Sequence, residues 1–268
     1  MSAVLHERGI EFADIAWRDR SLRLEYQWVG AAHSPYPVVV FLHEGLGSIK
    51  LWKDFPAAFC RANGFTGLVF SRYGYGRSTP RPPDERWPAT FMHEQASEVL
   101  PTLFSHLGIT RPWLFGHSDG ASISLLYAAL FSDKVSGIAV AAPHIFVEDI
   151  TIRSIEAARE AYLHQGLRAR LARFHDDVDS AFWGWNNIWL DPAFRSWNIE
   201  RELTRISCPV LAIQGEDDEY GSLEQIYGIQ RKVPHTTLLV LPQCAHSAHR
   251  DQPKATIEEV AKFIIGST

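Results

Sequence analysis

The sequence contains little cysteine, with three residues among 268 at wide and uneven spacing. Cys60, Cys208 and Cys244 lie in apolar or strand-like surroundings, so we expect reduced thiols within the core rather than disulfide bonds. This scarcity argues against a small secreted domain that depends on a disulfide framework. It favours a reducing compartment, and we expect a cytoplasmic location.

Long apolar runs and an excess of one charge are also absent. No stretch approaches the length that spans a membrane, and residues 1–9 have no apolar signal core, so we expect no membrane partner and no export. The 26 Lys and Arg residues stand against 31 Asp and Glu, which gives a net charge of -5 without a basic stripe. This balance argues against a nucleic-acid partner and favours a small-molecule substrate.

The sequence alternates apolar strands with amphipathic helices, which is typical of a mostly parallel sheet flanked by helices. Residues 10–17 and 22–29 predict an antiparallel hairpin before this alternation begins. We expect residues 1–143 and 206–268 to form an α/β core domain and residues 144–205 to form an inserted helical cap. The expected buried strands are 38–42, 65–70, 112–115, 135–142, 210–215 and 237–241, and the expected core helices are 51–63, 93–107, 121–130, 222–232 and 253–265.

The stretch Gly116-His117-Ser118-Asp119-Gly120 fits the G-x-S-x-G pattern of a nucleophile elbow. An elbow is a tight turn from strand to helix, which requires small residues at both ends and strains the residue at its apex. The apolar run 112–115 precedes the stretch and the helical pattern 121–130 follows it. Ser118 is therefore expected at a helix N-terminus, where backbone N–H groups favour an oxyanion. The alternative is a glycine-rich turn with an idle serine.

A nucleophilic serine needs a histidine as base, and the histidine needs a carboxylate that orients it. Asp217 and Asp218 lie just past one expected strand, and His246 lies just past the next. The order serine, acid, histidine is the order in which an elbow of this kind is completed along the chain. Glu148 and Asp149, which follow the strand after the elbow helix, are alternative acids.

Four segments share their pattern with one known family: the oxyanion-type loop His43–Ser48, the loop Arg72–Ser78, the elbow 116–120, and Gly215-x-x-Asp218 followed by His246 and by Gln252-Pro253. Over nearly its whole length the chain resembles the α/β-hydrolases of the bacterial esterase, lactonase and meta-cleavage-hydrolase group. The resemblance implies the α/β-hydrolase fold. It also implies that Asp218, three residues after Gly215, is the acid, and that the backbone N–H of Asp119 and that of Gly45 or Leu46 form the oxyanion hole.

The chain departs from that group at two positions. Members usually have glycine directly after the histidine, where this chain has Glu44 or, alternatively, a one-residue insertion. We expect the Glu44 carboxylate to turn away and pair with a cation or with backbone N–H groups. The alternative is that Glu44 faces the pocket and selects cationic substrates. Ser247 replaces the tryptophan that meta-cleavage hydrolases place after the catalytic histidine, and Ser118 excludes the branches that use an aspartate nucleophile.

The expected cap supplies the candidate pocket residues. Trp183, Trp185 and Trp189 are expected to line a substrate-binding pocket together with Glu44, although cap helices need an apolar face in any case. The H-x-x-H spacing at 246–249 has no matching carboxylate or thiolate, so no metal is assigned.

We therefore predict a serine hydrolase that cleaves a carboxylic ester or lactone through an acyl-enzyme, with Ser118 as nucleophile, His246 as base and Asp218 as orienting acid. This chemistry requires no cofactor. A carbon–carbon bond hydrolase of meta-cleavage products would use the same three residues and is the first alternative. A ligand-binding protein of the same fold with slow turnover is the second. Nothing in the sequence indicates an oligomeric state.

Overall fold

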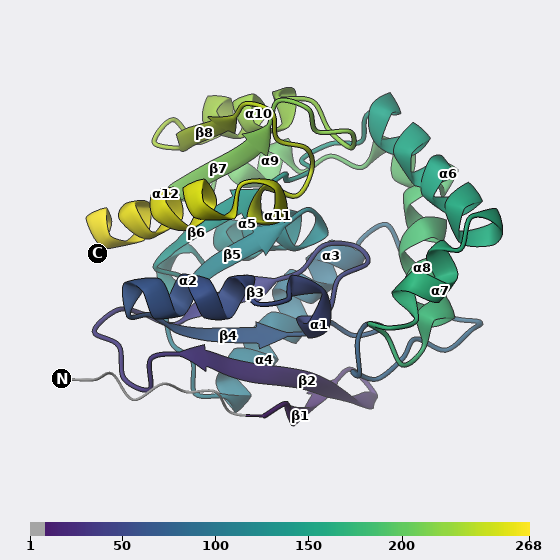
Figure 1. The fold of residues 1–268 in the computed structure, drawn as a ribbon, viewed down its shortest axis with the longest axis horizontal. Helices are drawn as coiled ribbons and strands as arrows, with labels where there is room; N and C mark the ends of the chain where they lie inside the picture. Colours follow the sequence, from purple (N-terminus) through teal and green to yellow (C-terminus); the bar gives the residue numbers. More distant parts are fainter. Residues whose placement is uncertain (1–8) are drawn as a thin grey trace.

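The computed structural model describes residues 9–268, in which an eight-stranded sheet lies between helical layers (Figure 1). The strand order is β1-β2-β4-β3-β5-β6-β7-β8. The first two pairings, β1 with β2 and β2 with β4, are antiparallel, and the others are parallel. The strands are β1 (Glu11–Trp17), β2 (Arg20–Gly30), β3 (Val39–Leu42), β4 (Thr66–Phe70), β5 (Trp113–His117), β6 (Gly137–Ala141), β7 (Val210–Gly215) and β8 (Thr237–Leu241). The expected hairpin and the mostly parallel sheet are confirmed.

Two layers of helices bury the two faces of the sheet. Successive strand residues point to opposite faces, so Val40 and Leu42 of β3 belong to one apolar cluster while Val39 and Phe41 belong to the other. The first layer contains α3 (Phe91–Glu94), the π-helix η1 (Gln95–Val99), α4 (Leu100–His106), α5 (Asp119–Leu130), the short turn η2 (Ser132–Lys134) and α10 (Glu224–Lys232); the second contains α1 (Ile49–Trp52), α2 (Phe55–Asn63), α11 (Ala248–Asp251) and α12 (Pro253–Gly266).

Two of the expected helices are interrupted near a proline, which lacks the N–H that continues a helix. The helix expected at 51–63 begins earlier and breaks at Lys53, after which α2 restarts with Pro56 in its first turn. The helix expected at 93–107 contains η1, where the N–H of Leu100 donates to the carbonyl of Gln95 five residues back. This wider π turn lies immediately before Pro101 and accommodates it.

Between β6 and β7 the chain leaves the sheet and forms five helical segments. Helices α6, α7 and α8 stand beside the edge at which the parallel strands end (Figure 1). The last segment packs against α5 and α10 on the face of the sheet. We therefore propose that the cap consists of the first three helices rather than of the whole segment 144–205. The five segments are α6 (Asp149–His164), α7 (Leu167–Leu171), α8 (Val178–Trp189), η3 (Pro192–Ser196) and α9 (Glu200–Leu203).

Strands β3 and β5 are neighbours in the sheet although β4 lies between them in the sequence. The chain leaves β3 toward β4 on one side, and it leaves β5 toward β6 on the other. Connections that diverge in this way open a crevice at the carboxyl ends of the strands. Leu42 of β3 pairs with Gly116 of β5, so the loop after β3 and the serine turn after β5 meet in this crevice.

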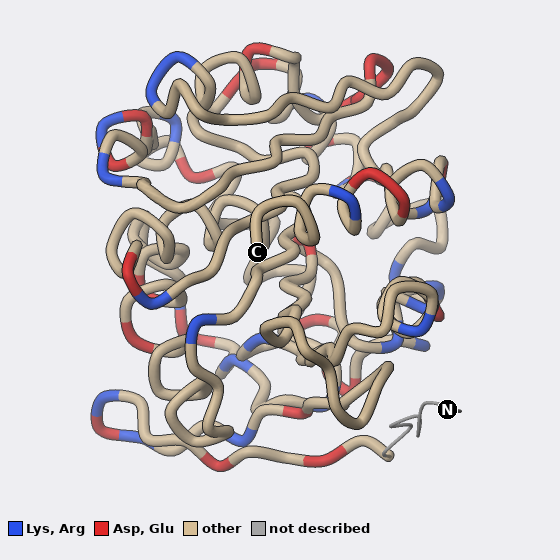
Figure 2. Tube along the Cα trace, turned by 90° about the vertical axis from the view of Figure 1, so that its left-hand side faces the viewer, with Lys and Arg blue, Asp and Glu red and all other residues tan. Residues whose placement is uncertain are grey.

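Several features that the composition predicted can be located in the structure. Cys60, Cys208 and Cys244 are buried and free, as expected. Figure 2 shows Lys and Arg interspersed with Asp and Glu along the chain. No helix within residues 9–268 combines the length and apolar character needed to cross a membrane. The expectation about the N-terminal stretch concerns residues 1–9, of which residues 1–8 lie outside the described residues.

Candidate active site

Ser118 lies at the apex of a tight turn between β5 and α5. Its backbone has φ 53° and ψ -119°, a left-handed conformation that is unfavourable for any residue with a Cβ and must be held by its surroundings. A Cβ added to Gly116 would lie 2.4 Å from the carbonyl oxygen of Gly120, and one added to Gly120 would lie 2.1 Å from that of Leu42. The two glycines thus allow the turn to close against β3.

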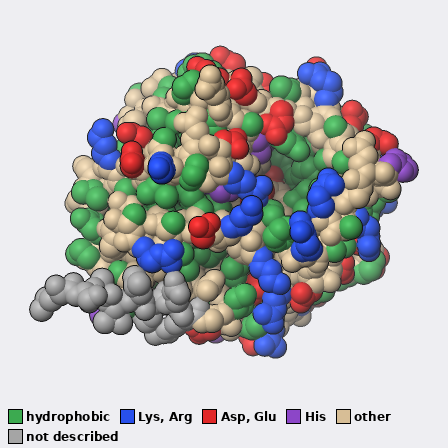
Figure 3. Space-filling view, viewed as in Figure 1, with side chains coloured by type: hydrophobic (Ala, Val, Ile, Leu, Met, Phe, Trp, Pro, Cys, Tyr) green, Lys and Arg blue, Asp and Glu red, His purple; other side chains and the backbone are tan. Residues whose placement is uncertain are grey.

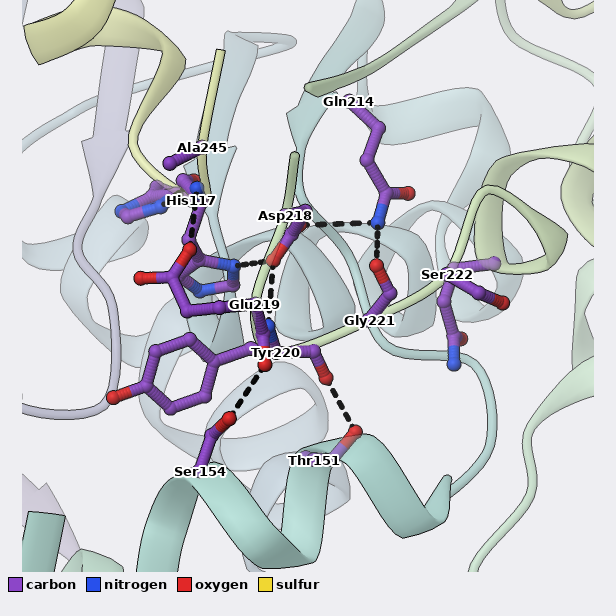
Figure 4. Close-up of polar contacts among 12 residues, drawn as sticks. His117, Thr151, Ser154, Gln214, Asp218, Glu219, Tyr220, Gly221, Ser222 and Ala245 are labelled. Carbon is purple, nitrogen blue, oxygen red and sulfur yellow. Dashed lines mark hydrogen bonds and ion pairs between the residues drawn. The ribbon is translucent and has the colours of Figure 1, made fainter. Parts of the chain in front are cut away.

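His246 and Asp218 form a buried pair at the ends of β8 and β7. The Nδ1 of His246 lies 2.8 Å from Oδ1 of Asp218 and donates to it, which leaves Nε2 of the neutral ring as an acceptor. Asp218 also accepts from the backbone N–H of Tyr220 at 2.8 Å and from Nε2 of Gln214 at 3.0 Å (Figure 4). Three donors therefore fix the orientation of this carboxylate, and the carboxylate fixes the tautomer of the histidine.

The two groups shift each other's pKa in opposite directions. Burial alone would raise the pKa of Asp218, but the hydrogen bond and charge of His246 outweigh burial and hold this pKa below its ordinary value. Burial alone would lower the pKa of His246, but the hydrogen bond to Asp218 and the negative charges of Asp218, Glu219 and Glu44 raise it. The acid therefore stays ionised, and the histidine becomes a stronger base.

The other three candidate acids lie in different surroundings. Asp217 is exposed to solvent. Glu148 accepts hydrogen bonds from groups at the N-terminus of α10, and Asp149 pairs with an exposed arginine of η3. Of these four carboxylates, Asp218 is the one that is hydrogen-bonded to the ring of His246.

The loop after β3 is held through the carbonyl oxygen of Glu44. This oxygen accepts from Nδ1 of His43 at 2.7 Å, from Nη2 of Arg72 at 2.9 Å and from the N–H of Gly47 at 3.1 Å. The Nε2 of His43 in turn accepts from the N–H of Arg72 at 2.9 Å. Burial and the charge of Arg72 lower the pKa of His43 well below its ordinary value, so this histidine is neutral and positions the loop.

The next residues of this loop present backbone N–H groups beside the serine turn. Within residues 9–268 the N–H groups of Gly45, Leu46 and Asp119 have no hydrogen-bond partner. A Cβ added to Gly45 would lie 2.2 Å from atoms of the Trp185 indole, so only glycine fits beneath α8 at this position. His175 donates from Nε2 to the carbonyl oxygen of Leu46 at 2.9 Å and fixes the other side of the loop.

The side chain of Glu44 is partnered and yet lies at the cavity wall. Its Oε2 lies 3.6 Å from Nδ1 of His117, and its Oε1 lies 3.5 Å from Nη2 of Arg250. Burial would raise the pKa of Glu44, but His117 and Arg250 hold it well below its ordinary value. His117 also donates from Nε2 to the carbonyl oxygen of His246 at 2.9 Å, so the ionised Glu44 lies beside a histidine that anchors the segment carrying His246.

A cavity of about 450 Å³ opens beside the serine. It brings together most of the residues that the sequence singled out. From the sheet edge it is lined by Ser118, Asp119 and His246, from the loop after β3 by Glu44, Gly45 and Leu46, and from α8 by Trp185 and Trp189.

Trp183 does not line this cavity, which corrects the expectation for this residue. Trp185 and Trp189 are four residues apart and share one face of α8, whereas Trp183 is two residues before Trp185 and points elsewhere. Its indole packs edge-on against Tyr162, with a centroid distance of 5.5 Å, and lies under the guanidinium of Arg159.

The carboxyl group of Asp119 is directed into protein contacts. Its Oδ1 accepts from Nε1 of Trp189 at 3.1 Å, and its Oδ2 lies 3.6 Å from Nη2 of the buried Arg72. Burial raises the pKa of Asp119 despite these two partners. The side chain thus ties the start of α5 to α8.

Three further residues of the cavity were not singled out from the sequence. The ring of Tyr220 lies 4.7 Å from that of His246, and Oε2 of Glu219 accepts from the backbone N–H of His246 at 3.1 Å. The ring of His144 lies 6.0 Å from that of His246, and burial and the charge of His246 lower the pKa of His144 to about 3. Glu219 and Tyr220 follow Asp218 after β7, and His144 follows β6. These positions after strand ends were the available signal in the sequence.

Helix α6 holds the segment that follows Asp218. The hydroxyl of Thr151 donates to the carbonyl oxygen of Tyr220, and that of Ser154 donates to the carbonyl oxygen of Glu219 (Figure 4). The first turn of α6 therefore fixes the loop that follows Asp218. Among residues 9–268, no three His, Cys, Asp or Glu side chains are grouped so that they could hold a metal ion.

A mostly parallel sheet with this strand order and a strained serine at a strand-to-helix turn defines an α/β-hydrolase fold. The chain belongs to the alpha/beta hydrolase family, whose model matches residues 39–259. It is therefore a hydrolase of this family, and the expected fold and family are confirmed.

The chain is similar to curated members of several activities. It is 26% identical over 258 residues to the putative carbamate hydrolase RutD of Pseudomonas savastanoi, covering 88% of this chain and 96% of that protein. It is 25% identical over 200 residues to the human serine hydrolase BPHL, covering 69% of this chain and 64% of that protein.

Solved structures show the same fold at lower identity. A carboxylesterase structure from Nitrososphaera gargenis has a TM-score of 0.76 and 22% identity, covering 96% of this chain and 98% of that chain. The enol-lactonase of Burkholderia xenovorans has a TM-score of 0.73 and 17% identity, covering 95% of this chain and all, 100%, of that chain. At these identities the likeness concerns the fold alone.

Proposed function

We propose that this hydrolase cleaves a carboxylic ester or lactone of a small molecule through an acyl-enzyme. The observation that carries the proposal is the hydrogen bond of 2.8 Å between His246 and Asp218, made by a histidine that lines the same cavity as the strained Ser118. Because Nδ1 of His246 donates to the acid, Nε2 is the nitrogen that can take a proton.

In the first half of the reaction, Oγ of Ser118 attacks the ester carbonyl carbon while Nε2 of His246 takes the hydroxyl proton. The carbonyl oxygen becomes an oxyanion, which the N–H of Asp119 and that of Gly45 or Leu46 stabilise. The tetrahedral intermediate then collapses. The bond to the alkoxy oxygen breaks, His246 returns its proton to this oxygen, and the alcohol leaves the acyl group on Ser118.

In the second half, water replaces the alcohol. His246 takes a proton from the water while the water oxygen attacks the acyl carbon, and the same N–H groups stabilise the second oxyanion. The bond to Oγ of Ser118 breaks and His246 protonates this oxygen, which releases the carboxylic acid. Asp218 stays ionised throughout and stabilises the imidazolium, as its lowered pKa supports.

Two other bond types and a binding protein with slow turnover are alternatives that the same assay can test. Similarity to a putative carbamate hydrolase makes a carbamate a substrate to compare with esters. A carbon–carbon hydrolase of meta-cleavage products would use the same nucleophile, base and oxyanion hole. A binding protein with slow turnover would retain the geometry without the rate.

A panel of esters, lactones, carbamates, amides and ring-fission diketones tests the proposal, with the Ser118→Ala protein as blank. We expect an ester or lactone to give the highest kcat/KM and the alanine protein to give no turnover above background. Turnover confined to diketones or carbamates would replace the proposed bond type. Equal rates with the alanine protein would overturn the proposal altogether.

A further inference from the structure

Basic side chains surround the mouth of the cavity although the whole chain has a net charge of -5. Lys53, Arg170, Arg173 and Arg250 all line the cavity and all are exposed. Figure 3 shows a hollow in this face of the molecule with Lys and Arg side chains on both sides of it. The local charge at the opening is therefore opposite in sign to that of the protein.

The carboxylates that line the same cavity already have partners. Glu44 lies 3.5 Å from Arg250, and Asp119 lies 3.6 Å from the buried Arg72. Glu219 accepts the backbone N–H of His246. Of the four cations at the mouth, Arg250 is thus matched by a carboxylate of the protein.

The other three cations are unmatched. Within residues 9–268, Lys53, Arg170 and Arg173 form no ion pair with a carboxylate. By contrast, Arg168, which lies on α7 together with Arg170, pairs with Asp179 at 2.6 Å. Arg168, which does not line the cavity, is paired with a carboxylate, whereas Arg170 and Arg173, which line it, are not.

The unmatched cations lie on both sides of the opening. Lys53 belongs to the core and ends α1 with φ 54°, a backbone conformation that a lysine rarely adopts. Arg170 and Arg173 belong to α7 and the turn after it. Arg170 donates from Nη1 to the carbonyl oxygen of Gln165 at 3.1 Å, and Arg173 donates from Nε to the carbonyl oxygen of Arg170 at 3.3 Å. These bonds hold both arginines near the backbone of this turn.

We propose that Lys53, Arg170 and Arg173 bind a negatively charged group of the substrate, a carboxylate or a phosphate, at the mouth while the scissile ester lies at Ser118. This inference rests on the proposed function, since it names the class of ester that the site takes. The cavity is also lined by apolar side chains, among them those of Leu171, Phe174, Ile155 and Trp185. The substrate is therefore an ester or lactone with an apolar middle and an anionic far end.

Exposed cations act on such a substrate in two ways. Each contact with an anionic group contributes modestly because water screens it, and guanidinium groups add bidentate hydrogen bonds to a carboxylate or phosphate. The combined field of three cations also raises the local concentration of anions at the opening. Both effects weaken as the salt concentration increases. Neutral substrates are not attracted by the cations, so salt should leave their turnover unchanged.

The test compares kcat/KM for two p-nitrophenyl esters of matched size. One is the mono-p-nitrophenyl ester of glutaric acid, with a free carboxylate, and the other is its methyl-capped neutral counterpart. We expect the protein to prefer the anionic ester, and the preference to fall about threefold in Arg170→Gln or Arg173→Gln and about tenfold in the double variant. Added salt should reduce the preference in the parent protein and have little effect in the double variant.

Arg168→Gln is the matched control, because it removes the same charge from the same helix at a residue that does not line the cavity. The preference should survive this change. An unchanged preference in the double variant, an equal loss in the control, or a parent protein that prefers the neutral ester would overturn the inference. The p-nitrophenyl monoester of a phosphorylated hydroxy acid, assayed alongside, distinguishes phosphate from carboxylate as the preferred anion.

A binding measurement separates this inference from the proposed chemistry. Monomethyl glutarate is titrated calorimetrically into the Ser118→Ala protein and into the same protein with Arg170→Gln and Arg173→Gln. Binding that the two substitutions weaken about tenfold supports the anion site even if no ester is hydrolysed. Equal affinity in both proteins, or no binding in either, contradicts the anion site whatever the enzyme assay shows.

Discussion

The sheet-side wall and the cap-side rim of the cavity differ in how their charges are arranged. On the sheet side, Asp218 and His246 are buried and hydrogen-bonded to each other, and Asp119 lies beside the buried Arg72. At the rim, Arg170 and Arg173 are exposed and have no carboxylate partner within residues 9–268. Buried, partnered groups hold a fixed geometry, whereas exposed groups adapt to a ligand. In the proposed function the sheet side cleaves the bond, and in the further inference the rim selects the substrate.

Replacing Ser118 should produce the largest loss on the sheet side. Ser118→Ala removes the attacking oxygen, and we expect kcat to fall by about 10⁶-fold, leaving the contributions of binding and the oxyanion hole. The fold should remain, because the hydroxyl adds little to core packing. Steady-state kinetics with circular dichroism as a folding control checks this. A residual rate near that of the parent would remove Ser118 from the mechanism.

Asp218→Asn should come next, with kcat lower by about 10⁴-fold, because an amide in place of the carboxylate favours the wrong tautomer of His246. Asp217→Asn is the matched control one residue away, at an exposed position, and should retain most of the activity. Kinetics of the two proteins on one ester decide between them. The reverse ranking would move the acid to Asp217.

Gly45→Ala tests the junction between the two walls. The added Cβ would meet the Trp185 indole at 2.2 Å, so the loop must shift and displace its N–H groups. We expect kcat to fall by about 10²-fold, as for the loss of one oxyanion donor. Trp185→Ala in the same protein removes the indole atoms that the added Cβ meets and should restore part of the rate, with Trp185→Ala alone as control. An unaffected Gly45→Ala protein would place the oxyanion hole elsewhere.

The smallest expected effect is a shift of the pH profile. His246 must be neutral to accept a proton and its pKa is raised, so kcat/KM should rise with pH through a value above the ordinary pKa of histidine. Glu219→Gln removes one of the charges that raise this pKa, and it should move the acidic limb to lower pH. Glu216→Gln, an exposed change in the same loop, is the control and should leave the limb in place.

The sheet-side half of the site could be predicted from the sequence because it depends on local pattern and chain order. Apolar runs located the strands, and the turn after each strand located Ser118, Asp218 and His246. The choice of Asp218 over Asp217 needed the spacing of the family. The structure adds the reason, since Asp218 points inward to three hydrogen-bond donors while Asp217 is exposed.

The cap-side half could not be predicted in the same way. Helical spacing alone places Trp185 and Trp189 on one face of α8 and Trp183 on another, but it does not say which face meets the cavity. The orientation of α7, which carries Arg170, and of the following turn, which carries Arg173, depends on tertiary packing. Ion pairs between different helices, such as Arg168 with Asp179, leave no pattern along the chain. The sequence therefore does not show which rim arginines lack a carboxylate partner.

The most direct test of the central claim is covalent labelling by a fluorophosphonate followed by peptide mass spectrometry. The account predicts that the label is found on the peptide that contains Ser118, that Ser118→Ala abolishes it, and that Asp218→Asn slows it while Asp217→Asn does not. Labelling of another residue, or undiminished labelling of the Ser118→Ala protein, would contradict the assignment of Ser118 as the nucleophile.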